Sequence, residues 1–347
     1  MADNKAYEAW LRTHCSVVAK DLRSKHEQMA EKPFKFLRAT YFRWAKTIEH
    51  VCPELENSPR VLCVGDIHME NFGTWRDAEG RWVWGVNDFD EGAVMPYAFD
   101  LVRLATSIRL APKMPLGGRA IEAALLNGYR EGLDRPCATL LDEAQLWMRP
   151  FVACSDEERG KFWKEVFEYP KAAPPPDVKA GLRRSLPKGA KMMRFCTRVG
   201  GLGSLGRPRY VAIAEYGGGH VVREAKAVVP SAWTWAHGRD DVANAFARLT
   251  RGAYRSPDPF LSVHNGFVFR RIAADSRKIE LGNARDLCSA GMARAMGFDL
   301  ASVHAADRRA RALHTDVRAR PAGWLRNASR AAQEAVEKDF RAWRASR

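Results

Sequence analysis

Two short segments of the chain carry carboxylates and an amide directly after apolar runs. The first, residues 64–73 (VGDIHMENFG), contains Asp66 and Asn71. The second, residues 86–91 (VNDFDE), contains Asp88 and two further acids. Two strands that each end in carboxylates can direct them into one pocket, and hard divalent cations prefer oxygen ligands. The pattern therefore indicates chemistry on phosphate groups with a divalent metal.

A glycine-rich segment, residues 200–206 (GGLGSLG), supplies a second feature and satisfies G-x-G-x-x-G. That pattern alone is weak. Here strands are expected on both sides of it, which is the context of a loop that covers phosphates, because backbone N–H groups approach where no Cβ blocks them. The simpler alternative is a glycine-rich hairpin turn followed by an exposed strand lysine. The residues expected to contact a nucleotide are Gly201, Gly203, Ser204, Gly206 and Lys226.

Together these segments resemble the protein-kinase-like superfamily, in particular the aminoglycoside phosphotransferases. Their catalytic loop has the form H-G-D-x-H-x-x-N, which residues 65–71 match except that Val64 replaces the leading histidine, and their metal-binding D-F or D-W pair matches at Asp88. The chain more closely resembles an uncharacterised bacterial family, a domain of unknown function. Its members carry G-D-x-H-x-E-N-F-G, N-D-F-D-E, a glycine loop and a K-x-x-x-x-S strand, whose last spacing fits Lys226 and Ser231.

The resemblance covers most of residues 30–310 and implies ATP and Mg²⁺ as cofactors, with phosphoryl transfer to a hydroxyl as the reaction. In ordinary kinases the glycine loop and lysine precede the catalytic loop, whereas here they follow it. The resemblance therefore implies a circularly permuted order, which is tolerable where chain ends lie close together. A second departure concerns Lys226: the helix expected over 240–254 has acids only at its start, so the lysine lacks an evident acidic partner.

The same resemblance implies a role for each side chain of the two acidic segments. Asp66 would accept a hydrogen bond from the attacking hydroxyl and orient it. Asn71 and Asp88 would hold Mg²⁺ against the phosphates, and Asp90 would add a further ligand or a base. His68 is counted with Asp66 among the catalytic residues, and it is expected to stabilise the loop by hydrogen bonding rather than to ligate metal.

Other residues near these segments are expected to be structural. Asp100, at the head of a helix, would hold the backbone of the catalytic loop. Arg38 and Arg103 would form ion pairs. Trp82 and Trp84 are expected in the core of a hairpin that turns at residues 77–80.

These residues must be positioned by the helices and strands that the sequence leads us to expect. Together with the resemblance, these elements indicate an α+β protein with a protein-kinase-like, two-lobed fold in permuted order. A small antiparallel sheet lobe would accompany a larger helical lobe. Strands are expected near residues 194–199, 209–215, 220–226 and 267–272, and long helices over 283–306 and 322–345. The predicted parts are residues 1–189, the first part of the helical lobe with the catalytic and metal loops at 60–91; residues 190–275, the nucleotide-covering lobe; and residues 276–347, the helices that complete the large lobe.

Composition is that of a globular protein, with 347 residues, 46% hydrophobic and 28% charged. No apolar run reaches the length of a membrane-spanning helix, and no signal peptide is expected. The 7 cysteines lack C-x-x-C spacing, which favours a reducing cytoplasmic location over a disulfide framework. The formal net charge of +15 favours anionic partners such as nucleotides.

Four other functions share parts of this pattern. A weak or inactive nucleotide-binding pseudokinase, or an adenylyl transferase, could use the same fold. A metallophosphoesterase shares the G-D-x-H opening, but Met69 stands where its motif has glycine and no G-N-H-D/E block follows. A nucleic-acid binder would use the positive charge, although no known reading module is recognised. The sequence specifies neither the hydroxyl-bearing acceptor nor the oligomeric state.

Overall fold

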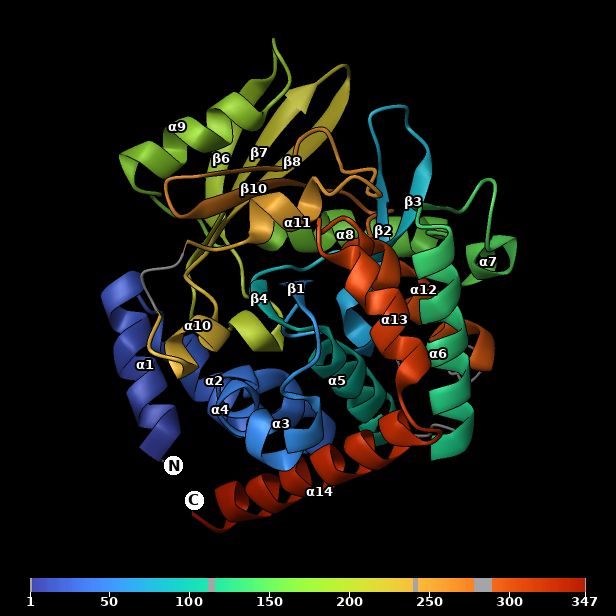
Figure 1. Ribbon diagram of the computed structural model, residues 1–347. Coiled ribbons are helices and arrows are strands. Elements are labelled where there is room, and N and C mark those ends of the chain that lie inside the picture. Colours follow the sequence, from blue (N-terminus) through green and yellow to red (C-terminus); the bar gives the residue numbers. More distant parts are fainter. Residues whose placement is uncertain (1, 112–115, 240–242, 278–288, 347) are drawn as a thin grey trace.

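The protein combines a region rich in strands with a larger region rich in helices, which confirms the predicted α+β class (Figure 1). In the view of Figure 1 the larger sheet lies at the top and most helices lie below it. The computed structural model describes residues 2–111, 116–239, 243–277 and 289–346.

The larger sheet is antiparallel, with the strand order β6-β7-β8-β10-β9. The turn between β7 and β8 contains Gly217 and Gly218, both at positive φ, as tight hairpins require. One face of the sheet packs on helix α9 (Pro176–Ser185), and the other contacts Val166 of helix α8 (Asp156–Glu168). The strands are β6 (Lys191–Thr197), β7 (Arg209–Tyr216), β8 (Gly219–Ala227), β9 (Ser262–His264) and β10 (Phe267–Ile272).

A second group of strands carries the two acidic segments. The predicted hairpin is confirmed, and Asp77 holds its turn by accepting hydrogen bonds from the backbone N–H groups of Glu79 and Arg81. Trp82 and Trp84, on its second strand, are buried as expected. The strands are β2 (Phe72–Arg76), β3 (Trp82–Val86) and β5 (Thr139–Leu140) in one sheet, and β1 (Arg60–Cys63) with β4 (Ala93–Pro96) in another.

The helical region is built around α5, which is buried along almost its whole length. Helices α6 and α12 approach so closely that a Cβ at Gly128 or Gly297 would overlap backbone of the other helix. The helices are α1 (Ala2–His14), α2 (Ala19–Met29), α3 (Pro33–Ala39), α4 (Tyr41–Val51), α5 (Tyr97–Leu110), α6 (Gly118–Asp134), α7 (Arg149–Val152), α10 (Ala232–Ala236), α11 (Phe246–Thr250), α12 (Ala290–Ala305), α13 (Ala310–Ala319) and α14 (Trp324–Ala345). None of these helices is both long and apolar enough to cross a bilayer.

Two predicted segments differ from the structure. The helix expected over 240–254 is described only as the short α11, and Asp240 and Asp241 lie outside the described residues. The proline-rich residues 169–177 lead into α9, which begins at Pro176. Proline is well tolerated in the first turn of a helix, where its missing N–H costs nothing, so prolines here begin an element instead of separating two. The helix expected over 283–306 is α12, and its predicted start lies outside the described residues.

Candidate functional site

The loop after β1 is fixed by Asp100 of α5, as the sequence predicted. Its carboxylate accepts hydrogen bonds from Val64 N at 2.7 Å and Gly65 N at 3.0 Å, and lies 3.1 Å from His304 Nε2. Gly65 has φ +80°, and a Cβ there would lie 2.2 Å from the carbonyl oxygen of Glu91. Only glycine fits this turn, and the turn carries Asp66 to the second acidic segment.

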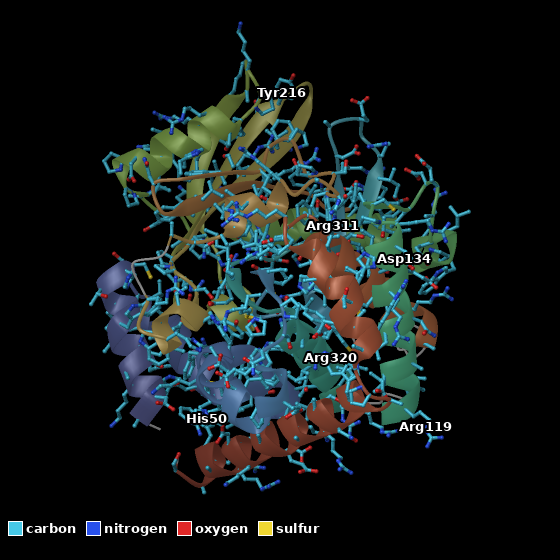
Figure 2. The ribbon with its side chains drawn as sticks, viewed as in Figure 1. His50, Arg119, Asp134, Tyr216, Arg311 and Arg320 are labelled. Atoms are coloured by element: carbon cyan, nitrogen blue, oxygen red, sulfur yellow. The ribbon has the colours of Figure 1, made fainter. Side chains whose placement is uncertain are left out.

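Substitution of Asp100 by alanine is expected to lower the free energy of unfolding by about 3 kcal/mol, because two buried N–H groups lose their acceptor at a cost of about 1–3 kcal/mol each. Urea denaturation monitored by circular dichroism measures this. Asp134→Ala is the control. This exposed carboxylate is at the C-terminal end of α6 (Figure 2), and its loss should change the unfolding free energy by less than about 0.5 kcal/mol. An equal loss in both variants would contradict the anchoring role of Asp100.

Asp66 is held on one side by Arg103, which is fully buried on α5. The Arg103 Nε donates to Asp66 Oδ1 at 3.1 Å, and its guanidinium lies between the rings of Tyr41 and Trp44, with centroids at 4.9 and 5.0 Å. Burial raises the pKa of Asp66 to about 6, with Arg103 acting in the opposite direction. A carboxyl with this pKa exchanges protons close to neutral pH, which suits a residue that orients or deprotonates a hydroxyl.

The rest of the loop is shaped by its own polar side chains. His68 is buried and its Nδ1 accepts a hydrogen bond from the backbone N of Glu70 at 3.2 Å, so it contributes to loop structure. Asn71 Nδ2 donates to the carbonyl oxygen of Asp66 at 2.5 Å. This bond leaves the amide oxygen as the atom that Asn71 can offer to a cation. Glu70 forms an ion pair with Arg38.

Lys226 joins the larger sheet to the second acidic segment. It extends from β8, is almost fully buried, and its Nζ lies 3.1 Å from Asp88 Oδ1 and 2.5 Å from Asp90 Oδ2. The expectation that this lysine lacks an acidic partner is therefore wrong: the acids come from the loop after β3, not from the helix that follows β8. Ser231, five residues after it, donates to the carbonyl oxygen of Glu91 and joins the same two segments.

Oxygen atoms of three side chains that line one cavity fit a hard divalent cation. Asp88, Asp90 and the amide oxygen of Asn71 are donors of the kind that Mg²⁺ takes. Asp90 Oδ1 is buried and has no hydrogen-bond partner among the described residues. Burial raises the pKa of Asp90, and the neighbouring Asp88 acts in the same direction. Buried carboxylates that repel each other are stabilised by a cation, so this set is the candidate metal site.

A second cluster contains side chains of the kinds that bind metals, those of Cys63, Asp100 and His304. It is less suited to a metal ion than the first. Its ligand atoms lie within 4.8 Å of one another and all three residues are buried. The Asp100 carboxylate already accepts two backbone hydrogen bonds and contacts His304 Nε2, and His304 Nδ1 lies 2.8 Å from the hydroxyl of Tyr129. These polar atoms therefore already have partners, and the cluster supports the loop after β1.

The glycine segment lies against Asp66 but is more ordered than a hairpin loop. Residues 202–204 form a 3₁₀ turn, and Leu202 and Leu205 are buried among residues of α2, α3 and α14. The N–H groups of Ser204, Leu205 and Arg207 bond within the turn, so in this conformation they do not face a phosphate. The structure thus differs from the expected row of open N–H groups, because the two leucines anchor the segment in the core.

The predicted glycines differ in what requires them. A Cβ on Gly203 would lie 3.2 Å from Asp66 Oδ2, so this glycine permits the close approach to the loop after β1. Gly206 has φ +96° and faces Leu22. A Cβ on Gly201 would meet no described atom within 4 Å, so packing does not require glycine there. Ser204 accepts a hydrogen bond from Arg209.

A charged cluster on the cavity side of the sheet was not predicted. Glu224, two residues before Lys226 on β8, is fully buried and pairs with Arg270 at 2.6 Å, Arg209 at 3.1 Å and Arg198 at 3.5 Å. Burial alone would raise the pKa of Glu224, but the three arginines hold it well below its ordinary value. One carboxylate and three guanidinium groups leave an excess of two positive charges. Side chains alternate along a strand, so Glu224 and Lys226 lie on one face of β8. This spacing is the sequence signal that could have identified Glu224 as part of the site.

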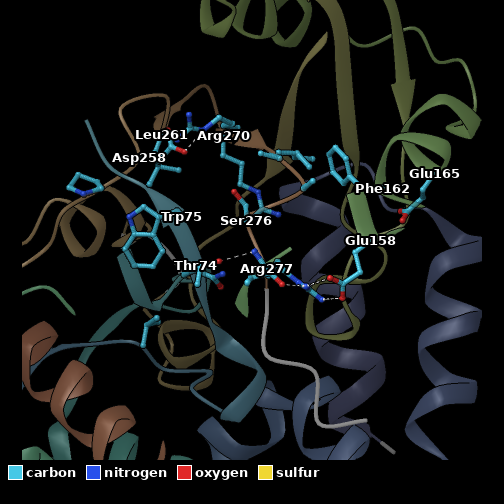
Figure 3. Close-up of a pocket in the computed structure, with 18 of the residues that line it drawn as sticks. Thr74, Trp75, Glu158, Phe162, Glu165, Asp258, Leu261, Arg270, Ser276 and Arg277 are labelled. Carbon is cyan, nitrogen blue, oxygen red and sulfur yellow. Dashed lines mark hydrogen bonds and ion pairs between the residues drawn. The ribbon is translucent and has the colours of Figure 1, made fainter. Parts of the chain in front are cut away.

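Two cavities meet at this cluster, since Arg198 and Arg270 line both. The larger, about 970 Å³, lies between the sheet and the β2–β3 hairpin (Figure 3). Apolar side chains, including Trp75, Phe162 and Leu261, alternate on its walls with charged ones. The smaller, about 260 Å³, contains Asp66, Asn71, Asp88, Asp90 and the glycine segment among its lining residues.

The chain after β10 is tied to the hairpin beside the larger cavity. Thr74 N donates to the carbonyl oxygen of Arg277 at 2.8 Å, and Arg277 N donates to Thr74 Oγ1 at 3.1 Å (Figure 3). The guanidinium of Arg277 also pairs with Glu158 of α8. These contacts fix the wall of the larger cavity where the chain leaves the sheet.

Residues 17–135 match the model of a family described as an uncharacterized protein conserved in bacteria (DUF2252). This supports the predicted resemblance to a bacterial domain of unknown function. The match covers the loop after β1, the second acidic segment and Asp100. No curated protein and no solved structure gives a match to the chain.

Proposed function

We propose that this chain is an ATP- and Mg²⁺-dependent phosphotransferase with a protein-kinase-like fold in circularly permuted order, which moves a phosphoryl group to the hydroxyl of an acceptor. The observation that carries the proposal is the meeting of Lys226 from the sheet with Asp88 and Asp90, beside a glycine segment that contacts Asp66. Phosphoryl transfer depends mainly on positioning and charge neutralisation, and this arrangement supplies both.

The different chemical character of the two cavities supports placing the base and ribose in one region and the phosphates in another. The larger cavity has the volume and apolar walls for a base and ribose. The excess positive charge of Arg198, Arg209 and Arg270 lies where it opens toward Asp88, which suits the phosphates. Mg²⁺, held by Asn71, Asp88 and Asp90, would neutralise phosphate charge. Lys226 would exchange part of its contact with the aspartates for a phosphate oxygen.

The proximity of the two chain ends supports the permuted order. Arg43 of α4 donates to Asp339 of α14 at 2.8 Å and also pairs with Asp3 of α1. The first and last helices are thus joined through one side chain, and Figure 1 places N and C near each other. Circular permutation requires ends that can be linked without disturbing the core.

Substitution of Asp88 by asparagine tests the proposal. The unaltered chain should gain thermal stability from ATP only when Mg²⁺ is present, because binding to the folded state alone raises the melting temperature. Asp88→Asn should lose most of this gain, while Asp177→Asn, an exposed aspartate at the start of α9, should keep it. An ATP effect that does not depend on Mg²⁺ or on Asp88 would contradict the proposed site.

Radiolabelled ATP separates the proposed reaction from its alternatives. Label at the γ-phosphate should move to an acceptor if the chain transfers phosphoryl groups, and label at the α-phosphate if it transfers adenylyl groups. A pseudokinase would bind Mg²⁺ and ATP without moving either label. A metallophosphoesterase would hydrolyse an aryl phosphate with Mn²⁺ in the absence of ATP.

A further inference from the structure

The smaller cavity is closed on one side by the N-terminal helices. Tyr7 of α1, Lys25 of α2, Arg38 of α3 and Phe42 of α4 line it together with Asp66. None of these four residues lines the larger cavity. A ligand that reaches Asp66 from this side therefore meets a wall that is separate from the cavity proposed for the base and ribose.

The carboxylates around this cavity already have basic partners. Asp66 pairs with Arg103, and Glu70 pairs with Arg38. Glu91 pairs with Arg207. Asp88 and Asp90 pair with Lys226, as described above.

Lys25 differs from these basic residues because it has no carboxylate partner within the described part of the chain. It is only 6% exposed, and its Nζ donates to the carbonyl oxygen of Gly203 at 3.2 Å. It lies on the apolar side of α2, at helical spacing from the buried Leu22 and Met29. Burial lowers the pKa of Lys25 to about 8, and the positive charge of Arg207 acts in the same direction.

A buried ammonium that pairs directly with no carboxylate is costly even where Glu91, Glu8 and Asp66 act on it from farther away, and an anionic ligand in direct contact lowers that cost. A second donor also lacks a partner: Arg38 Nε is buried and has no hydrogen-bond partner among the described residues. Lys25 and Arg38 line the same cavity as Asp66. The wall opposite the sheet is therefore suited to negatively charged oxygen atoms.

We infer that the acceptor is a small hydroxylated molecule with a carboxylate or phosphate group, which pairs with Lys25 while its hydroxyl faces Asp66. This inference rests on the proposed phosphotransferase function. A cavity of about 260 Å³ lies below the range of about 300–1,000 Å³ typical of drug-sized ligands, so it suits a small molecule and not a protein segment.

The transfer step balances with these groups alone. The acceptor hydroxyl oxygen forms a bond to the γ-phosphorus of ATP, and the bond from that phosphorus to the β–γ bridging oxygen breaks. The bridging oxygen keeps the electron pair and leaves with ADP. The hydroxyl proton passes to Asp66.

A fractionation experiment on the full chain tests the inference. The small-molecule fraction of a bacterial extract, freed of nucleotides with charcoal, is divided on an anion-exchange resin into a retained fraction and a flow-through. Each is incubated with the protein, Mg²⁺ and γ-labelled ATP. We expect labelled product from the retained fraction at a rate at least about tenfold above that from the flow-through.

Lys25→Met should lower labelling from the retained fraction about tenfold or more by raising the KM for the acceptor, with the KM for ATP unchanged. Lys25→Arg, which keeps the charge, should retain most of the activity. Lys20→Met, an exposed lysine of the same helix, is the matched control and should change neither value. Melting curves of each variant show whether it folds.

Four results would overturn the inference. They are labelling from the flow-through at an equal rate, label found only on protein, no label from either fraction while Mg²⁺ and ATP still stabilise the chain, and a Lys25→Met effect on the KM for ATP instead of the acceptor. If Mg²⁺ and ATP did not stabilise the unaltered chain, the proposed function would be contradicted, and the inference rests on that function.

Discussion

Asp66→Asn is expected to lower kcat about 10²–10⁴-fold, the range by which a positioned acid or base accelerates proton transfer. Thermal stabilisation of the variant by ATP and Mg²⁺ should remain, because the oxygen atoms proposed to bind Mg²⁺ belong to Asn71, Asp88 and Asp90. Asparagine keeps the size of Asp66 but cannot take the hydroxyl proton. Steady-state kinetics of γ-phosphate transfer measures the loss, and melting temperature with ATP and Mg²⁺ provides the binding control.

The pH dependence of the reaction provides a second test of Asp66. Since burial raises its pKa to about 6, kcat/KM should rise with pH through about 6 as the carboxylate forms, and then level off. The residual activity of Asp66→Asn should lack this rise. A wild-type profile that is flat between pH 5 and 7, or a variant with near-normal kcat, would contradict the assigned role.

Stability should respond to pH in the opposite sense. The folded-state pKa of Asp66 lies above the ordinary value of 3.8, so its carboxyl favours the folded state most below that value. The contribution is lost as the pH rises through about 6. The unfolding free energy of the wild type relative to Asp66→Asn should therefore fall from pH 4 to pH 7, which urea denaturation at several pH values measures.

The sequence predicted the parts of the site that follow a local rule. Asp66 and Asp88 follow the apolar runs of β1 and β3, and Asn71 lies in the same loop as Asp66. The three residues line one cavity, as the strand-end rule predicted. Asp100 was predicted because it stands at the head of a helix beside the loop. Such predictions succeed because the backbone of one short segment fixes the direction of the side chains.

The partners of Lys226 could not be predicted in the same way. Asp88 and Asp90 lie far from it in sequence, and only packing of the sheet on the hairpin region brings them within contact. Lys25 was missed because a helix lysine is expected in solvent, although its spacing from Leu22 and Met29 placed it on the buried side. Tertiary packing, which local patterns do not report, decided both positions.

Glu224→Gln is expected to lower the free energy of unfolding by about 3–5 kcal/mol, because removal of one member of a buried ion cluster leaves uncompensated charge. Three guanidinium groups, those of Arg198, Arg209 and Arg270, would then surround a neutral amide. The pKa of Glu224, held well below its ordinary value, indicates that the folded state strongly favours its charged form. Urea denaturation at pH 7 measures the effect. Glu215→Gln, an exposed position on the neighbouring strand β7, is the matched control.

A second substitution shows whether repulsion among the arginines causes the loss. Arg270→Gln in the Glu224→Gln background should recover part of the lost stability, since it removes one of the cations left without a partner, whereas Arg270→Gln alone should destabilise the chain. This coupling in a double-mutant cycle is expected for groups in direct contact. Additive effects would mean that the cluster is not a unit. Because Arg198 and Arg270 line both cavities, a nucleotide triphosphate should restabilise Glu224→Gln more than the wild type, as its phosphates would replace the missing anion.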